Sequence, residues 1–229
     1  MTNTEILAQE QPGVPQGLAD ETVVERVRAG EVQLFELLMR RHNSRVFRVV
    51  RSIVRRDDEA EDVMQDAYVR AFDHLREFRG EARFSTWLTR IAVHEALARL
   101  RRERRFESLD TREEDCAVMP SDAVVSPEQR ASDGEVRALL QRSVDELPDD
   151  FRSVFVLREV EQLSVAETAA CLGIPEDTVK TRLFRARKRL QETMLRSLDV
   201  GLPQLYEFHL SRCDRVVAAV MARIASRGR

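Results

Sequence analysis

Residues 163–190 constrain this chain more than any other stretch, because they carry the start and stop signals of two short helices joined by a tight turn. Ser164 and Glu167 form a capping-box pair, so a helix should start at Ser164. Gly173 should end that helix, since glycine readily adopts the left-handed conformation that closes many helices. Acids at residues 176–177 favour the start of a second helix, where the helix dipole is positive. The pattern predicts a helix-turn-helix.

The second of these helices sorts its residues by face. Apolar residues at three- and four-residue spacing predict a buried stripe of Val179, Leu183, Ala186 and Leu190. The opposite face and its flanks carry polar and basic residues, which include Thr178, Lys180, Thr181, Arg182, Arg185 and Lys188. Arginine can pair with guanine edges in a major groove, and flanking basic residues can sit near phosphates. A solvated basic helix is the alternative, but the cap and the glycine turn favour DNA binding.

The composition of the whole chain favours an all-α protein. Its 229 residues carry a net charge of only −3 although 34% are charged, so acidic stretches must balance the basic helices. Alanine, leucine, arginine and glutamate recur at helical spacing. We find no secretory segment and no apolar run of membrane-spanning length, and we expect a cytoplasmic protein. Cys116, Cys171 and Cys213 are widely spaced, which fits a reducing compartment.

Breaks in the helical pattern divide the chain into two helical domains. We expect a mobile tail over residues 1–19, a first domain over 20–106 and a second domain over 135–198. Residues 107–134 are rich in acids and punctuated by proline and serine, which predicts a flexible linker. Residues 199–229 form an extension beyond this plan.

A predicted helix at about residues 59–75 has one face that core packing does not explain. This face carries Asp62, Gln65, Asp66 and Val69. Asp62 and Asp66 are like charges four residues apart, which destabilise an isolated helix by a few tenths of a kcal/mol. We expect Val69 to be exposed beside them. A protein partner would account for both features, and a merely solvated acidic face is the alternative.

Aromatic and basic residues gather later in the first domain. Phe78, Arg79, Phe84 and Trp87 lie around a glycine-interrupted loop, after which Ser85 should cap the next helix. The end of that helix is strongly basic and includes Arg99, Arg101 and Arg102. Aromatic rings beside an arginine cluster suit unpaired bases and phosphates. We favour core packing over base stacking for Phe84 and Trp87, and nucleic-acid binding for the arginines.

The C-terminal extension has an apolar stripe at helical spacing, formed by Val216, Val217, Val220, Met221 and Ile224. We expect a helix that packs on the chain's own domains rather than on a separate partner. His209 and Cys213 are four residues apart, but two side chains are two ligands short of a structural zinc site. We therefore predict no metal site and no cofactor.

Three segments together resemble the extracytoplasmic-function (ECF) group of bacterial RNA polymerase sigma factors. The helix of sigma region two that binds core polymerase resembles EAEDVMQDAYVRAF at residues 59–72. The melting and minus-ten segment of that region resembles FSTWLTRIAVHEALARLRR at residues 84–102. Sigma region four resembles LPDDFRSVFVLREVEQLSVAETAACLGIPEDTVKTRLFRARKRL at residues 147–190. The segments occur in the right order and cover most of residues 20–198.

This resemblance implies a role for each candidate residue. The acidic face, with Asp62, Gln65, Asp66 and Val69, would dock on the polymerase. Minus-ten recognition and melting would involve Phe78, Arg79, Phe84, Trp87, His94, Arg99, Arg101 and Arg102, with a flipped base captured by the loop. His94 departs from the asparagine that the family often has at this position. The minus-thirty-five element would be read by Thr178, Lys180, Thr181, Arg182, Arg185 and Lys188.

The expected function is that of a sigma factor, not an enzyme. Its partners would be core RNA polymerase and promoter DNA, with an anti-sigma factor as a further candidate. The free protein would be a monomer and would not insert into a membrane. One alternative is a conventional helix-turn-helix regulator with an N-terminal sensing or dimerisation domain. A DNA-acting enzyme is another, although no residue sits in a recognisable catalytic frame.

Overall fold

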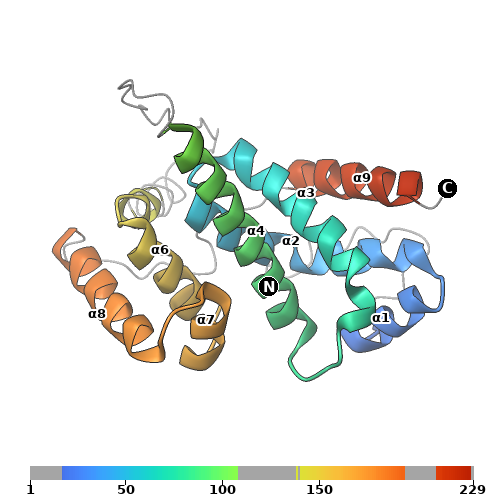
Figure 1. Cartoon of the computed structure of the whole chain (residues 1–229), viewed down its shortest axis with the longest axis horizontal. Helices are drawn as coiled ribbons and strands as arrows, with labels where there is room; N and C mark the ends of the chain where they lie inside the picture. The colour runs from blue at the N-terminus through green and yellow to red at the C-terminus, as the bar shows by residue number, and fades with distance from the viewer. Residues whose placement is uncertain (1–16, 108–137, 139, 194–209, 228–229) are drawn as a thin grey trace, which may run out of the picture.

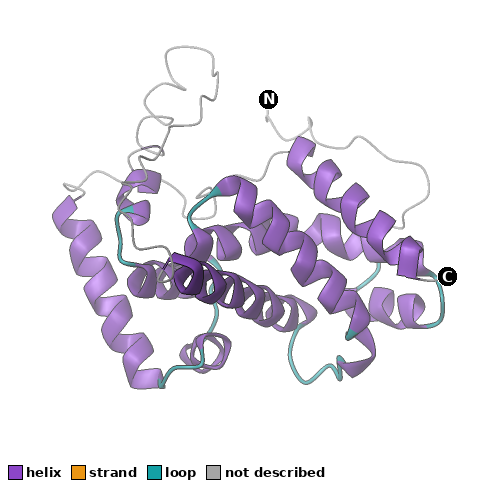
Figure 2. Ribbon diagram, turned by 45° about the horizontal axis from the view of Figure 1, so that its top comes forward, coloured by secondary structure: helices purple, strands orange, loops and turns teal. Residues whose placement is uncertain are grey.

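All regular elements in the computed structural model are helices, as far as it describes the chain (Figure 1, Figure 2). The described residues are 17–107, 138, 140–193 and 210–227. This confirms the prediction of an all-α protein. Most of the predicted tail and linker lies outside the described residues. None of the described helices is long and apolar enough to cross a membrane.

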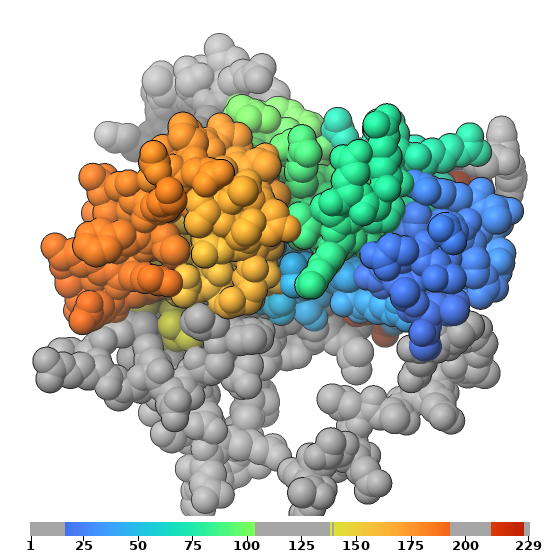
Figure 3. Space-filling view, turned by 90° about the horizontal axis from the view of Figure 1, so that it is seen from below, coloured from blue at the N-terminus to red at the C-terminus, as the bar shows by residue number. Residues whose placement is uncertain are grey.

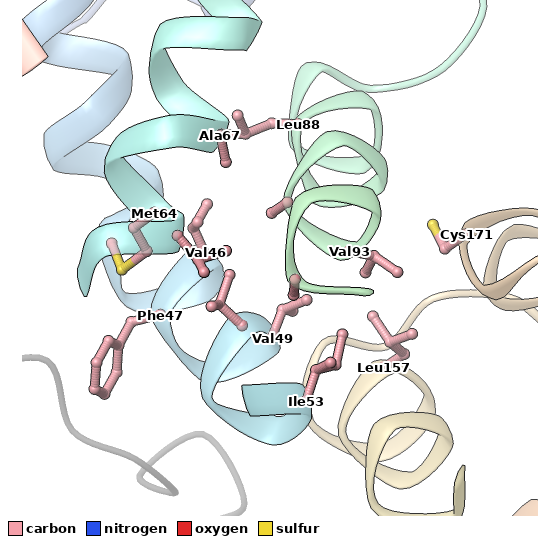
Figure 4. Packing of buried hydrophobic residues seen from close by; sticks show 14 of the residues in the cluster. Val46, Phe47, Val49, Ile53, Met64, Ala67, Leu88, Val93, Leu157 and Cys171 are labelled. Carbon is pink, nitrogen blue, oxygen red and sulfur yellow. The ribbon is translucent and has the colours of Figure 1, made fainter. Parts of the chain in front are cut away.

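The first domain is built from four α-helices and two short 3₁₀ turns. In chain order these are α1 (Asp20–Arg28), η1 (Val32–Leu34), α2 (Phe35–Val54), α3 (Asp57–Asp73), η2 (Leu75–Glu77) and α4 (Phe84–Glu107). Helices α2, α3 and α4 pack on one another, and their apolar faces meet in the core that Figure 4 shows. The buried Tyr68 donates its hydroxyl to the carbonyl of Met39 at 3.3 Å, so even the polar end of this ring is satisfied inside the core.

The second domain contains the helix-turn-helix. It runs through helical residues 140–145, α6 (Asp149–Phe155), the π-helical turn η3 (Val156–Val160), α7 (Val165–Leu172) and α8 (Glu176–Thr193). Ser164 Oγ accepts from the amide of Glu167 at 3.1 Å, and the Glu167 carboxylate accepts from the amide of Ser164 at 2.8 Å. Gly173 ends α7 with a φ of 65°. The predicted capping box and glycine stop are both confirmed.

The two domains pack directly on each other. Helix α2 contacts α6 and η3, while α4 contacts α7. In Figure 4, Leu157 of the second domain lies beside Ile53 of α2 and Val93 of α4. All three side chains are buried in the same apolar cluster. The hydrophobic core therefore continues from one domain into the other.

A buried arginine joins the backbones of the two domains. Arg152, at the start of α6, is fully buried and donates from Nε to the carbonyl of Ser52 in α2 at 2.6 Å. Its Nη1 donates to the carbonyls of Leu147 at 3.1 Å and Asp145 at 3.2 Å. Nη2 donates to the Asp149 carboxylate at 2.8 Å. The guanidinium thus satisfies groups from both sides of the interface.

A buried carboxylate also joins the two domains through ion pairs. Glu161, just after the π-helical turn, is buried and lies 2.6 Å from Arg48 Nε and 3.2 Å from Arg45 Nε, both in α2. The π-helical turn itself ends with an i to i−5 bond from the amide of Glu161 to the carbonyl of Val156 at 3.0 Å. The turn therefore ends on the residue that pairs with the first domain.

Helix α9 (Leu210–Arg227) follows the second domain in sequence but packs on the first, against α2 and α3. Figure 1 shows it beside α3, on the far side of the molecule from α8. The buried part of its stripe is Val216, Val217, Val220 and Ile224. The prediction of a helix docked on the chain's own domains is confirmed. Cys213 is also buried, and Asn43 donates to its Sγ at 3.0 Å. His209 lies outside the described residues.

Replacing Arg152 with alanine should lower the free energy of unfolding by about 3 kcal/mol, because buried carbonyls and the Asp149 carboxylate lose a donor. Urea denaturation followed by circular dichroism measures this change. The control is Arg56→Ala, which removes a pair with Asp58 in which both side chains are exposed. That change should cost less than about 1 kcal/mol. Equal effects of the two substitutions would contradict the role of the buried arginine.

Candidate nucleic-acid interface

Helix α8 presents a basic face to solvent because its apolar stripe is buried. Val179, Leu183, Ala186 and Leu190 are all buried, as the spacing predicts. On the other side, Lys180, Thr181, Arg185 and Lys188 are exposed, and Thr178 and Arg182 are half-buried. The structure therefore brings the six predicted residues onto the outer side of one helix.

Several basic residues on α8 also have acidic partners, namely Lys180, Arg182, Arg187 and Lys188. Lys180 lies 2.9 Å from Asp177 on its own helix, and Arg182 lies 2.6 Å from Asp150 at the start of α6. The Lys180 pair is exposed on both sides, so it contributes little to stability and can exchange for a phosphate. Arg182 is more restrained than Lys180, since its side chain is partly covered.

Sequence reasoning missed one residue of this face. Phe184 is 69% exposed, and it is the one large apolar side chain in the described part of the chain that stands out into solvent. It lies three residues after Thr181 and four before Lys188, so it shares their side of the helix. Its position outside the apolar stripe was the available signal. An exposed ring in a major groove can contact the methyl group of thymine.

A second candidate surface surrounds the loop before α4. A cavity of about 710 Å³ opens there between the loop and α7. Its walls include Phe78, Arg79, Trp87 and Arg90 from the first domain, and Glu167, Ala170 and Cys171 from the second. Figure 3 shows this loop and the α7 region side by side on one face of the molecule. Thr86 Oγ1 donates to the Glu167 carboxylate at 3.2 Å and so ties the two walls together.

The aromatic rings at this cavity divide into supporting and lining groups. Phe84 is almost fully buried, as predicted, and its ring centre lies 5.7 Å from those of Phe78 and Trp87. Trp87 is half-buried and lines the cavity, so the preference for core packing holds only in part for this ring. The predicted cap at Ser85 is wrong, because α4 already begins at Phe84. The two phenylalanines thus hold the indole at the edge of an open space.

The basic end of α4 is partly neutralised. Arg99 Nε lies 3.0 Å from Glu59 of α3 and 3.4 Å from Glu103 on its own helix. Arg101 and Arg102 are exposed on the next turn. His94 is largely exposed, and partial desolvation of its ring, together with the positive charges of Arg90 and Arg70, lowers its pKa below the ordinary value. A lowered pKa favours the neutral imidazole, which can offer an acceptor as well as a donor.

The acidic face of α3 differs from the prediction at one position. Asp62 and Asp66 are exposed and Gln65 is half-buried, as a partner surface requires. Val69 is only 3% exposed, so the expectation that it faces solvent is wrong. The reason is that α3 packs against three helices, α2, α4 and α9. More of its circumference is therefore buried than a single apolar stripe would cover. A docking surface here consists of polar side chains rather than an exposed valine.

Together these features define a two-domain helical protein with an exposed basic helix, an aromatic cavity and a separate acidic face. Comparison with known proteins is consistent with this class. Residues 38–106 match the family model of sigma-70 region 2, and residues 137–190 match that of sigma-70 region 4.

Two curated relatives extend the match over most of the chain. The RNA polymerase sigma-H factor of Pseudomonas aeruginosa is 34% identical over 180 residues, covering 76% of this chain and 93% of the relative. The ECF RNA polymerase sigma-E factor of Escherichia coli is 36% identical over 178 residues, with the same two coverages of 76% and 93%.

Solved structures agree with the fold. One is CnrH in complex with the cytosolic domain of CnrY, with a TM-score of 0.51 and 25% identity over 76% of this chain and 96% of that chain. Another is the sigma factor RpoE of Bartonella quintana with the anti-sigma factor NepR, with a TM-score of 0.52 and 24% identity over 73% and 96%. The second likeness, at this identity, concerns the fold alone.

These matches make the protein a promoter-directing subunit of RNA polymerase, a transcription initiation factor and not an enzyme. The chain belongs to the ECF group of sigma-70 factors. The alternative of a conventional helix-turn-helix regulator is not favoured, because the region 2 match accounts for the first domain that such a regulator would use for sensing.

The Glu59 carboxyl of α3, which lies beside Arg99 of α4, should make stability depend on pH. Burial raises its pKa to about 7, as does the nearby Glu103, while Arg99 opposes the shift. From its ordinary value of 4.5 up to about 7, the folded state keeps a proton that the unfolded state has lost. Stability should therefore fall as the pH rises through this window.

Glu59→Gln should remove that fall and make the protein more stable than the wild type at pH 8, by about 1 kcal/mol, but not at pH 4. Urea denaturation across the pH range measures the difference. Glu21→Gln, at an exposed position on α1, is the control. Parallel stability curves for the wild type and Glu59→Gln would contradict the assignment.

Proposed function

We propose that three surfaces of this sigma factor have separate roles in transcription initiation. The acidic face of α3, with Asp62, Gln65 and Asp66, docks on core RNA polymerase. The outer face of α8 reads the minus-thirty-five element in the major groove. The cavity at Trp87 receives a base of the melted minus-ten strand. The observation that carries this proposal is the exposed basic face of α8 on a capped helix-turn-helix. Helices α8 and α3 lie apart in the molecule (Figure 1).

The chemistry of each DNA surface suits its element. On α8, Arg185 can donate two bonds to a guanine edge, while Lys188 and Lys180 sit where phosphates line the groove. At the cavity, the indole of Trp87 offers a stacking face, and Arg79 and Arg90 add positive charge on the same walls. Unstacking a base costs a few kcal/mol, which stacking on the indole can offset.

Binding both promoter elements at once requires the two domains to separate. The names of the elements place them about 25 base pairs apart, or roughly 85 Å along the duplex at ~3.4 Å per base pair. A compact chain of this length has a radius of gyration of only about 17 Å. We infer that the packed arrangement of the domains is the state of the free protein, and that promoter binding opens it.

We further propose that the free chain is a cytoplasmic monomer and that an anti-sigma factor holds it inactive. Support for a protein partner comes from CnrH, which was solved with the cytosolic domain of CnrY. Sedimentation of the purified protein tests the monomer, and cell fractionation tests the location. Affinity purification that recovers polymerase but no dedicated inhibitor, in both resting and stressed cells, would count against the anti-sigma partner.

Reversing both charges, Asp62→Arg with Asp66→Arg, should weaken binding to sigma-free core polymerase by at least about tenfold, since like charges across an interface cost several kcal/mol. Binding assays and run-off transcription measure the loss. The matched control is Glu21→Arg with Glu25→Arg, because these acids are also exposed and four residues apart, on α1. If the control pair reduced binding equally, the loss would reflect net charge and not this face.

Replacing Arg185 and Lys188 with alanine should reduce transcription from a promoter that the wild-type holoenzyme uses, by about tenfold or more, because a good base contact is worth about 1–3 kcal/mol. Core binding should stay unchanged. Arg56→Ala with Arg142→Ala removes two exposed arginines elsewhere and serves as the control. Undiminished transcription by the α8 variant would exclude α8 as the reading helix.

A further inference from the structure

The C-terminal helix α9 lies on the same side of α3 as part of the proposed polymerase surface. Arg223 of α9 lies 2.9 Å from Asp66, which belongs to the predicted docking face. Earlier in the two helices, Arg215 lies 2.9 Å from Glu61. Arg212 lies 2.8 Å from Asp57 and 3.1 Å from Glu61. A row of α9 arginines therefore runs along a row of α3 acids.

These ion pairs are of two kinds. Asp57 is partly covered, and although burial alone would raise its pKa, hydrogen bonds from Arg212 and Arg51 outweigh burial and lower it. Its carboxylate is thus firmly ionised and held by α9. The pair at the other end is open to solvent, with Arg223 41% and Asp66 51% exposed. Open pairs contribute little to stability, so another cation can replace Arg223 at small cost.

Apolar contacts hold α9 in place more strongly than these pairs do. Val216 and Val220 are fully buried against the first domain, and Val217 is nearly so. Burial of a valine is worth roughly 1.5–3 kcal/mol relative to exposure. On α2, Arg40 pairs with Asp214 of α9 at 2.9 Å. Helix α9 therefore packs on α2 and α3 together. Contacts with both helices set its position beside the acidic residues of α3.

We propose that α9 is an internal competitor of core RNA polymerase for the acidic face of α3. In the free protein, Arg223 of α9 occupies the Asp66 carboxylate that the polymerase would otherwise engage, and the pairs of Arg212 and Arg215 hold α9 along the adjacent acids of α3. Helix α9 must therefore shift off α3 when the polymerase docks. This inference rests on the assignment of the docking face under the proposed function. It assigns a role to the extension, which lies beyond the residues that match the two sigma domains.

Charge complementarity supports this occupant of the surface. A docking face whose exposed residues are Asp62 and Asp66 selects a partner surface that supplies cations. Helix α9 supplies them from the chain's own sequence, already positioned by the valine stripe. Because the competitor is tethered, it acts at a high effective concentration. The apparent affinity for polymerase then equals the intrinsic affinity multiplied by the fraction of molecules in which α9 is displaced.

Hydrogen exchange of the full-length protein, with and without core polymerase, tests the displacement. When core is added, backbone amides of α9 at residues 210–227 should exchange faster, by about tenfold or more, while amides of α3 should become protected. Unchanged or increased protection of α9 in the complex would overturn the proposal, because α9 would then be a bystander or part of the docking surface.

Two substitutions that loosen α9 should strengthen binding to core, by about threefold or more. Arg223→Glu places like charge beside Asp66. Asp214→Arg instead repels Arg40 and leaves every α3 residue unaltered. Ala218→Glu adds a negative charge at an exposed position of α9 and is the control, which should bind like the wild type. Weaker or equal binding by both loosening variants would overturn the proposal.

The outcomes separate this inference from the proposed function. If Asp62→Arg with Asp66→Arg leaves core binding intact, the docking face itself is misassigned. If that variant loses binding but Arg223→Glu and Asp214→Arg bind no better than the wild type, the docking face stands and the competitor is excluded. Circular dichroism of each variant establishes that it is folded before binding is compared.

Discussion

The guanidinium of Arg152 is the interaction on which the arrangement of the two domains depends. It is wholly buried, yet most of its partners are backbone carbonyls, one from α2 and two from its own domain. Removing a charge from water is expensive, and only a complete set of acceptors offsets that cost. The contact therefore requires α2 and α6 to meet in one register, and the apolar contacts around Leu157 form in that same register.

The domain interface combines this apolar core with buried ionic contacts, and the two behave differently when the domains separate. Glu161 and its two arginines would each regain water if the domains parted, which repays part of the lost attraction. These ionic contacts fix the relative orientation of the domains, while their own net contribution to stability is reduced by the water that the charges regain on separation. The packed state therefore has one defined domain orientation, but the domains can still separate. This suits a protein that has to span two distant DNA elements.

Local signals in the sequence predicted the helix-turn-helix well, because Ser164, Glu167 and Gly173 act on their immediate neighbours. The apolar stripe of α9 was also predictable, but the surface it covers depends on α2 and α3 together and has no local signature. The same reason explains Val69, whose burial comes from three neighbouring helices. The only sequence signal for the exposure of Phe184 was its position outside the apolar stripe of α8. The DNA and polymerase roles of individual residues stay predictions.

Trp87 makes the intrinsic fluorescence of the protein sensitive to a single site. It is the single tryptophan of the chain, and its ring lines a cavity whose opposite wall belongs to the other domain. Indole emission moves to longer wavelength as the ring passes from apolar surroundings into water. Fluorescence of the unlabelled protein therefore responds both to separation of the cavity walls and to stacking of a base on the ring. Since DNA contains no tryptophan, the kinetics of opening on a promoter strand can be followed without attaching a dye.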